Sequence, residues 1–372
     1  MRASAVAGII FANSHDGALE PLTRLRSMSS VPFGGRYRLI DFALSNFVNS
    51  GITNVGIITK TSYRSLMDHI GSGKYWDLDR KNGGIRFLPP FNVKGIRRYD
   101  GYVEALYGAM DFMERCKSDH VVLYDGCVVG NIDISKAIDY HNSKDADVTV
   151  LYKMLENYRN NTEAMTFTYD ISGRITKASF PRVFEGTAAT SFGVLIFKRD
   201  VLVKLVKESY ENGARHIERD VISERLDELK VYAFEHKGFA TIMDSTETYF
   251  DANMSLLKKE VRNDLFDPRR PVYTKTRDDM PTRYGVDSHV TDSLISEGCV
   301  IEGTVKNSII SREVTVGKGA VVENCILMQG VSVGENTEMK YVVSDKNSVI
   351  GSEISIKGTE NKHIFIEKNR VM

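Results

Sequence analysis

The stretch ISREVTVGKGAVVENCILMQGVSVGENTEM, residues 310–339, carries an aliphatic residue or methionine at every sixth position. This interval joins Ile310, Val316, Val322 and Met328. It recurs at Val333–Met339 within the stretch and at Ile295–Ile301 and Val343–Val349 on either side of it. A period of six fits neither an α-helix nor a simple hairpin sheet. It predicts a left-handed parallel β-helix over residues 291–372, in which each side of a triangular coil uses six residues and points one side chain inward. A β-rich meander with coincidental spacing is the alternative.

The region before this repeat has a different pattern. Residues 263–290 contain Pro268, Pro271 and Pro281 and are predicted to form a linker. Short apolar runs at residues 5–12, 54–59, 120–124, 148–152 and 192–197 predict buried strands. Helix-like stretches at 39–50 and 103–113 lie between them. Residues 1–262 are therefore predicted to form a doubly wound, Rossmann-like α/β domain with a mostly parallel sheet, and such domains bind ligands at the carboxyl edge of the sheet.

The composition excludes several classes of function. The 372 residues contain 49 basic and 49 acidic side chains, so there is no basic excess to indicate a nucleic-acid or membrane-surface partner. No segment approaches the roughly 20 apolar residues of a membrane span. The first twelve residues are interpreted as a core strand rather than a signal peptide, because Gly8 interrupts the apolar run. Four scattered cysteines favour a reducing compartment, and we expect a cytoplasmic protein.

Four segments carry a family resemblance. They are VPFGGRYRLIDFALSN at 31–46 with NSGI at 49–52, HIGSGKYWDL at 69–78, YFDANMSLL at 249–257 and PVYTK at 271–275. Together they resemble the glucose-1-phosphate adenylyltransferases (ADP-glucose pyrophosphorylases) over essentially the whole chain. The resemblance implies the reaction of ATP with glucose 1-phosphate to give ADP-glucose and pyrophosphate. That reaction needs an anion-binding loop, cationic side chains and carboxylates that hold Mg²⁺.

The loop after the first strand departs from the family pattern. The family has A-G-G-x-G-x-R-L-x-x-L-T, and residues 12–23 read ANSHDGALEPLT. The three glycines are replaced by Asn13, Ser14 and Asp16, and the arginine that contacts phosphate is replaced by Ala18. Side chains now occupy space that the backbone needs to approach a triphosphate, and Asp16 adds a negative charge.

Two further cations of the family are also replaced. The lysine that precedes the PFGG turn falls on Met28, and the lysine that contacts the sugar phosphate falls on Phe180. The family's G-T-A-D run becomes GYVE at residues 101–104. Loss of a single group that stabilises developing charge typically lowers a rate about 10²–10³-fold.

The two metal-binding aspartates of the family fall on Cys127 and Ile242 when no gap is introduced. Asp125 and Asp244 each lie two residues from these positions and could restore a carboxylate. Two alternatives therefore stay open at this point: loss of the metal site, or a displaced site built from Asp125 and Asp244.

These substitutions resemble the D-type subunit of the family, which accompanies a catalytic subunit in some bacteria. The resemblance implies a regulatory, catalytically deficient chain without catalytic residues or a cofactor of its own, with Mg²⁺ only in the catalytic partner. The expected assembly is a hetero-oligomer, a tetramer, with that partner. An active adenylyltransferase that uses Asp125 and Asp244, and a sugar-phosphate sensor that acts alone, are the alternatives.

Four arginines, Arg24, Arg26, Arg36 and Arg38, surround the PFGG turn. In the family, basic residues here and in the β-helix form an allosteric site for phosphorylated effectors, and arginine forks suit phosphate. Arg26 and Arg38 are the favoured candidates, because the family has arginine at both positions. The alternative is that these residues are solvated charges or intrachain salt bridges. The eight histidines show no metal-binding spacing, and no metal ligand is predicted.

Overall fold

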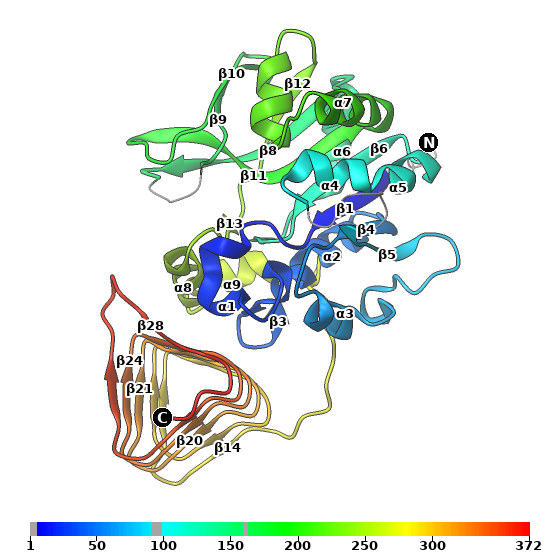
Figure 1. Cartoon of the computed structure of the whole chain (residues 1–372). Coiled ribbons are helices and arrows are strands. Elements are labelled where there is room, and N and C mark those ends of the chain that lie inside the picture. The colour runs from blue at the N-terminus through cyan, green and yellow to red at the C-terminus, as the bar shows by residue number, and fades with distance from the viewer. Residues whose placement is uncertain (1–5, 91–98, 159–162) are drawn as a thin grey trace.

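The computed structural model describes residues 6–90, 99–158 and 163–372. An α/β domain is followed by an extended connection and a triangular β-helix (Figure 1). The connection lies between helix α9 (Lys259–Leu265) and the first coil strand, β14 (Arg283–Tyr284). Residue 5, where the sequence predicted the first strand to begin, lies outside the described residues. No helix in the described part of the chain is both long and apolar enough to cross a membrane.

The central sheet is built around strand β1 (Val6–Phe11), which lies parallel to β4 (Asn54–Ile58) and β6 (His120–Asp125). Strand β5 (Gly84–Leu88) adds to β4 in the same direction. Beyond β6 the sheet is mixed, because β11 (Thr187–Lys198) runs antiparallel to β6 and to β8 (Val148–Glu156). The sheet also contains β9 (Thr166–Tyr169), β10 (Ile175–Ser179) and β12 (Val231–Glu235). The expectation of a mostly parallel sheet is therefore right only for the half that contains β1, since β8 to β11 follow one another without crossover helices.

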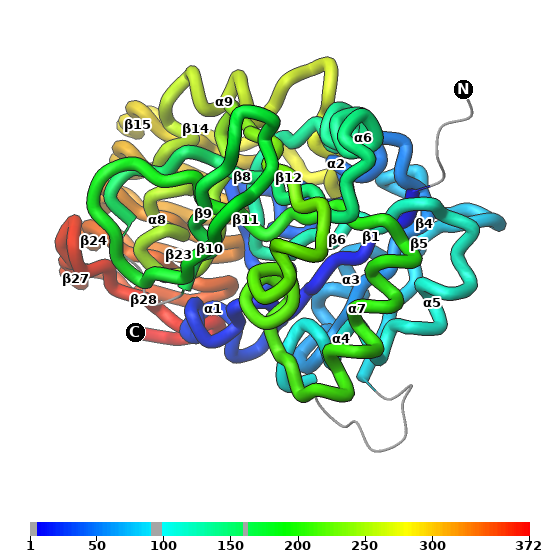
Figure 2. The backbone as a smooth tube through the Cα atoms, turned by 90° about the horizontal axis from the view of Figure 1, so that it is seen from above, coloured from blue at the N-terminus to red at the C-terminus, as the bar shows by residue number. Residues whose placement is uncertain are grey.

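Helices cover both faces of this sheet, with α6 and α7 on opposite sides of β1 (Figure 2). One face packs against α2 (Leu39–Asn49), α3 (Arg64–Ile70) and α6 (Ile134–Ser143). The other packs against α4 (Tyr102–Gly108), α5 (Met110–Arg115) and α7 (Arg199–Glu211). The single helix predicted over 103–113 is interrupted at Ala109, whose ψ of 10° departs from the helical value.

Side chains of β1 alternate between these two layers. Ile9 is part of one buried cluster and Ile10 of the other. Gly8 faces α2, and a β-carbon at this position would overlap the ring of Phe47. Glycine is therefore required here by close packing of helix on strand.

Short elements surround the end of β1 and the turn that follows. They are α1 (Glu20–Thr23), β2 (Pro32–Phe33), β3 (Tyr37–Arg38), β7 (Val128–Gly130), β13 (Ala240–Ile242) and α8 (Thr246–Ser255). The PFGG turn joins β2 to β3 as a hairpin. Asp41 then caps α2, because its carboxylate accepts hydrogen bonds from Arg38 N and Thr274 Oγ1. His69 also bonds to this carboxylate, so the motif holds the domain together locally.

The β-helix consists of three parallel five-stranded sheets, one for each side of the triangle (Figure 1). The first contains β14 (Arg283–Tyr284), β17 (Val300–Ile301), β20 (Thr315–Val316), β23 (Ser332–Val333) and β26 (Val349–Ile350). The second contains β15 (His289–Thr291), β18 (Thr304–Lys306), β21 (Val321–Glu323), β24 (Glu338–Lys340) and β27 (Ser355–Lys357). The third contains β16 (Leu294–Ile295), β19 (Ile309–Ile310), β22 (Ile326–Leu327), β25 (Val342–Ser344) and β28 (Ile364–Ile366).

The inward register differs from the strict six-residue period at three positions. The interior contains Leu327, Val342 and Ile350, each one residue away from the predicted Met328, Val343 and Val349. Paired strand residues in successive coils are 15 or 17 positions apart, or 22 for the last pair, β25 with β28, and never 18 as three sides of six would give, so the register slips. Met328 and Val343 instead pack against the α/β domain.

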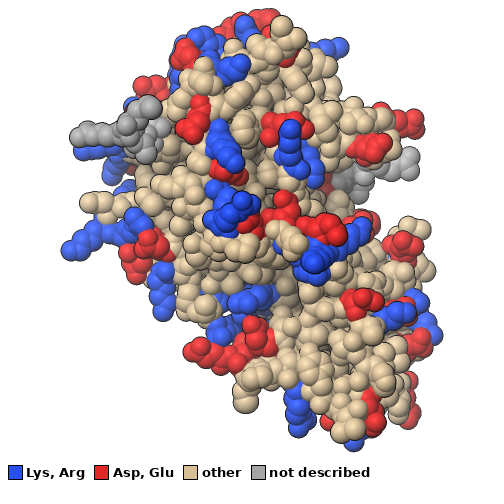
Figure 3. Space-filling model, turned by 180° about the vertical axis from the view of Figure 1, so that it is seen from behind, with Lys and Arg blue, Asp and Glu red and all other residues tan. Residues whose placement is uncertain are grey.

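This packing joins the two domains through an apolar layer and a buried ion pair. Ile309 and Ile326 of the β-helix contact a cluster that includes Phe33 of the α/β domain. Beside it, the Arg26 guanidinium contacts both carboxylate oxygens of Asp345 at 2.9 Å. Acidic and basic side chains are interspersed over the back of the molecule (Figure 3).

Candidate functional site

A cavity of about 520 Å³ opens at the carboxyl edge of the sheet, where a ligand site is expected in this class of fold. The residues that follow β1, β4 and β6 form its floor, including Asn13, Lys60 and Asp125. The walls come from the segments around Phe180, Glu218 and Asp244. The cavity lies at the edge of the sheet where the sequence predicts ligand binding.

The loop after β1 is closed by its own side chains. Asn13 Nδ2 donates to Asp16 Oδ2 at 2.7 Å, and Asn13 Oδ1 accepts from Lys60 N at 2.8 Å. The other carboxylate oxygen of Asp16 accepts from Met28 N at 2.8 Å. These contacts fill the loop that would have to turn free amide groups towards a phosphate. The negative charge of Asp16 opposes an anion at the same place.

The five replaced family positions lie in three places. Phe180 and Ile242 line the cavity, so an apolar surface lies where the family has a lysine and an aspartate. Met28 and Cys127 are fully buried in the apolar cluster between the domains, and Ala18 lies on the short turn before α1. Met28 and Cys127 are therefore packing residues here as well as replacements for charged ones.

Asp125 and Asp244, the two alternative carboxylates, both line the cavity. Each accepts a hydrogen bond from a tyrosine: Tyr102 OH donates to Asp125 Oδ2 at 2.9 Å, and Tyr158 OH donates to Asp244 Oδ2 at 3.1 Å. Thr248 Oγ1 also donates to Asp244 Oδ1 at 3.0 Å. Sequence reasoning did not single out either tyrosine, although Tyr102 stands in the altered GYVE run.

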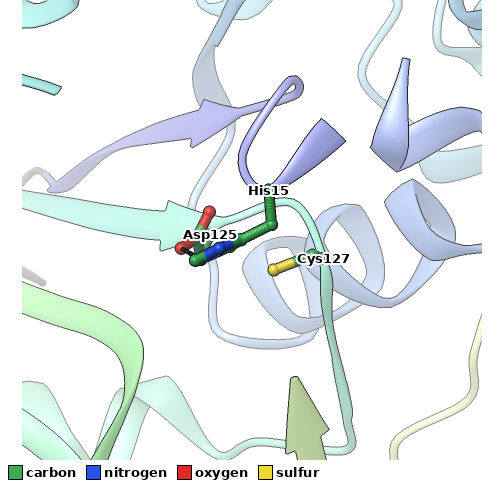
Figure 4. Close-up of side chains that lie close together, drawn as sticks. All are labelled: His15, Asp125 and Cys127. Atoms are coloured by element: carbon green, nitrogen blue, oxygen red, sulfur yellow. Dashed lines mark ion pairs between the residues drawn. The ribbon is translucent and has the colours of Figure 1, made fainter. Parts of the chain in front are cut away.

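Asp125 lies beside an imidazole and a thiol (Figure 4). His15 Nε2 is 3.6 Å from Asp125 Oδ2. The Cys127 sulfur lies next to the histidine side chain, and the three donor atoms are all within 4.8 Å of one another. Burial acts to lower the pKa of His15, but the hydrogen bond and negative charge of Asp125 outweigh it and raise that pKa overall. Burial raises the pKa of the Cys127 thiol well above its usual value.

These donors do not fit the Mg²⁺ ion that the family reaction implies. Magnesium binds oxygen ligands in octahedral geometry, whereas Asp125 is flanked by nitrogen and sulfur. The Asp244 oxygens accept hydrogen bonds from Tyr158 and Thr248. Among the described residues, the donor cluster around Asp125 thus has one carboxylate, and Asp244 lines the same cavity outside that cluster.

Glu218 is a further titratable group of the cavity wall that the sequence did not reveal. It lies in the turn Ile217–Ile222, and Ser191 Oγ donates to its Oε1. Burial, together with the negative charge of Asp125, raises the pKa of Glu218 to about 7, although the Ser191 hydrogen bond acts in the opposite direction. A carboxyl group of this kind is partly protonated near neutral pH.

A second cavity, of about 440 Å³, lies between the PFGG turn and the β-helix. Among the described residues, its cationic lining is Arg36, Arg38, Arg64, Lys275, Arg277, Arg312, Lys346 and Lys368. Asp68 is the acidic residue among the lining side chains that the structure describes. A concentration of guanidinium and ammonium groups around one hollow suits a multiply charged anion.

The four predicted effector arginines do not all reach this cavity. Arg36 and Arg38 line it. Arg26, one of the two favoured candidates, is only 4% exposed and its fork is used by Asp345. Arg24 is exposed and pairs with Glu367 at 2.5 Å. The salt-bridge alternative thus describes Arg24 and Arg26, and it applies in part to Arg36, whose guanidinium is 3.6 Å from Glu297 Oε1.

The remaining cations come from segments that are distant in sequence, and no local signal marks them. Arg64 begins α3, Lys275 and Arg277 lie in the connection, and Arg312, Lys346 and Lys368 belong to the β-helix. Crowding affects the titration of Lys346. Burial and the nearby charges of Arg38 and Arg26 lower the pKa of Lys346 to about 7.

Similarity to known proteins agrees with this description. Residues 7–259 match the nucleotidyl transferase family, and residues 279–365 match the GlmU-like C-terminal hexapeptide family. The chain therefore belongs to the nucleotidyl transferases that carry a hexapeptide β-helix, and within them to the glucose-1-phosphate adenylyltransferase family of glycogen biosynthesis.

Individual relatives match nearly the whole chain. The glycogen biosynthesis protein GlgD of Bacillus subtilis (strain 168) is 33% identical over 366 residues, which cover 98% of this chain and 96% of the relative. The glucose-1-phosphate adenylyltransferase of Bacillus mycoides (strain KBAB4) is also 33% identical over 366 residues, covering 94% and 92%. The corresponding enzyme of Bacillus cereus (strain Q1) gives the same values. Identity alone thus does not separate a regulatory from a catalytic role.

Proposed function

We propose that this chain is a regulatory, catalytically deficient subunit of glucose-1-phosphate adenylyltransferase in glycogen biosynthesis. The observation that carries the proposal is the closed loop after β1. Asn13 and Asp16 bond to the loop and its neighbours where the reaction needs free amide groups. The loss of a magnesium-type oxygen site at Asp125 adds to it. The chain then acts on a catalytic partner subunit with which it forms a hetero-tetramer, and Mg²⁺ belongs to that partner.

The basic cavity between the domains supplies a means of regulation. Its lining comes from the α/β domain, the connection and the β-helix, so an anion bound there contacts all three. A phosphorylated effector would offset the mutual repulsion of these cations and so favour one arrangement of the domains. In a mixed oligomer, that preference would change the rate or the effector response of the catalytic partner.

The test is an assay of ADP-glucose formation from ATP and glucose 1-phosphate. It compares the pure chain, a catalytic relative and a mixture of the two. The expected result is no turnover by the chain alone and a changed rate or effector response in the mixture. Turnover by the chain alone at a rate comparable with the relative would overturn the proposal.

Two variants test whether the effector response of the mixture arises at the basic cavity. Arg277→Gln combined with Lys368→Gln removes two cations from the lining and should weaken the effector response of the mixture. Lys318→Gln, at an exposed position of the β-helix outside this lining, is the matched control and should leave the response unchanged. An equal loss in both variants would contradict a site in this cavity.

An active enzyme with displaced ligands is the second candidate, because Asp125 and Asp244 line one cavity. Under that reading, Asp125→Asn and Asp244→Asn would each abolish turnover by the pure chain. A stand-alone sensor is the third, because the basic cavity is complete within one chain. It would bind a sugar phosphate but would neither co-purify with the catalytic subunit nor alter its rate.

A further inference from the structure

We propose that His15, Asp125 and Cys127 form a binding site for a divalent transition metal, with Zn²⁺ as the expected ion. The site differs in ligand chemistry from the family's magnesium site. It does not depend on whether the chain is catalytic or regulatory. Three donor atoms lie together there, and one carboxylate oxygen beside them has no hydrogen-bond partner among the described residues.

The three side chains come together only through the fold. His15 lies in the loop after β1, Asp125 ends β6, and Cys127 lies in the turn from β6 to β7. Their donor atoms all lie within 4.8 Å of one another. Figure 4 shows the imidazole of His15 extending towards Asp125, with the Cys127 thiol next to the histidine side chain. The histidine's left-handed backbone, with φ of 55°, directs its side chain into this position.

The spacing is close to that of a zinc site. Zinc bonds of about 2.0–2.3 Å in tetrahedral geometry place ligand atoms roughly 3.4–3.6 Å apart. His15 Nε2 and Asp125 Oδ2 are already 3.6 Å apart. The upper limit of 4.8 Å for the remaining pairs requires only small side-chain rotations of the kind that a bound ion imposes.

Asp125 supplies a second, independent observation. Its side chain is 7% exposed, yet Oδ1 has no hydrogen-bond partner among the described residues. A buried carboxylate oxygen without a partner is costly, and a cation would satisfy it. The other oxygen, Oδ2, is the one 3.6 Å from His15 Nε2, and it accepts from Tyr102 OH at 2.9 Å. Tyr102 thus holds the carboxylate in place, as an outer residue orients a metal ligand, while Oδ1 is left to bind the ion and Oδ2 lies beside it.

The donor set selects the metal. Thiolate and imidazole ligands favour zinc and related ions, whereas magnesium and calcium require oxygen. His15 and Asp125 also line the 520 Å³ cavity, so a fourth coordination position can be completed by water from that side. A bound ion would fasten the loop after β1 to the end of β6. The same loop is the one that can no longer cradle a triphosphate.

The first test is a metal titration of the full-length chain after removal of metal with a chelator. Zn²⁺ is added in competition with a chromophoric chelator, and Co²⁺ is used in parallel as a spectroscopic probe. We expect one equivalent of either ion, a near-ultraviolet absorption band from cobalt–thiolate bonding, and release of the thiol proton. Mg²⁺ in large excess should not displace the ion.

Variants identify the ligands. Cys127→Ser should abolish the near-ultraviolet band and weaken Zn²⁺ binding by more than the roughly 10–100-fold that loss of an outer-shell partner causes. Cys325→Ser, which alters another fully buried cysteine, in the β-helix, should leave both unchanged. His15→Asn lies in a loop at a half-buried position, so it provides a second measurement if Cys127→Ser does not fold.

Three outcomes would overturn the proposal. The first is the absence of stoichiometric Zn²⁺ binding by the intact chain. The second is binding that His15→Asn and Cys127→Ser leave unchanged. The third is displacement of the ion by an equal concentration of Mg²⁺, which would indicate an ordinary oxygen site.

Discussion

Replacing Arg26 by methionine should destabilise the junction between the two domains. The Arg26 and Asp345 side chains are 5% and 4% exposed, and both guanidinium contacts measure 2.9 Å. Removing one partner of a buried ion pair costs about 3–5 kcal/mol, because the remaining charge stays buried. Asp345 Oδ1 would still accept a hydrogen bond from Lys346 N at 2.7 Å, so the expected loss lies at the lower end, about 3 kcal/mol.

The assay is equilibrium unfolding in urea followed by far-ultraviolet circular dichroism. Arg24→Met is the matched control, because it breaks the Arg24–Glu367 pair, whose side chains are 57% and 59% exposed. Surface pairs of this kind contribute about 0–1 kcal/mol. The double variant Arg26→Met, Asp345→Leu should recover most of the loss, since it leaves no buried charge.

The reasoning would be refuted if Arg26→Met lost no more stability than Arg24→Met. It would also be refuted if the double variant were as unstable as the single one. Either result would mean that the buried pair is not the interaction that makes position 26 important.

Three further outcomes follow from the packing and the titrating groups. Gly8→Ala forces a β-carbon into the Phe47 ring and should cost about 1–3 kcal/mol in urea unfolding, whereas Gly17→Ala, with open space around it, should be near neutral. Burial and the neighbouring arginines lower the pKa of Lys346 to about 7, so this residue of the basic cavity loses its charge as the pH rises. Sulfate binding to the cavity, measured by calorimetry, should therefore weaken between pH 6 and pH 8. The variant Lys346→Met should show a smaller change over this range. Glu218 has a folded-state pKa raised to about 7, above that of the unfolded chain, so its contribution to stability is present at low pH and is lost as the pH rises through 7. Glu218→Gln should therefore gain stability relative to the original chain on going from pH 5 to pH 8, as measured by thermal unfolding; an unchanged difference would contradict the raised pKa.

The sequence predicted much of the architecture because the relevant signals are local. A period of six is a property of neighbouring residues, and it indicated the β-helix directly. The strands at the core of the α/β domain were apparent from short apolar runs such as 54–59, which the structure places at Asn54–Ile58. Replacement of the loop glycines by Asn13, Ser14 and Asp16 was also visible, because it depends only on residue identity.

Other features depended on distances that the sequence does not contain. The side chain that points into the β-helix is Ile350 and not the predicted Val349. The number of residues in a whole coil decides which residue points inward, and the six-residue spacing along one side does not contain that number. The closeness of Arg26 and Arg38 in the sequence could not show that they point to different places. Arg26 faces Asp345, whereas Arg38 lines the basic cavity.

The same limit applies to both sites. His15 and Cys127 are more than a hundred residues apart, and the parallel pairing of β1 with β6 brings them to one edge of the sheet. Lys275 and Lys346 meet at the basic cavity because the connection and the β-helix fold back beside the PFGG turn. The sequence by itself determined the α/β and β-helix parts of the fold and the replacement of the loop glycines, since periodicity and residue identity are local. Only the tertiary structure decided which charged side chains share a cavity and which donor atoms lie together, because that depends on how distant segments pack.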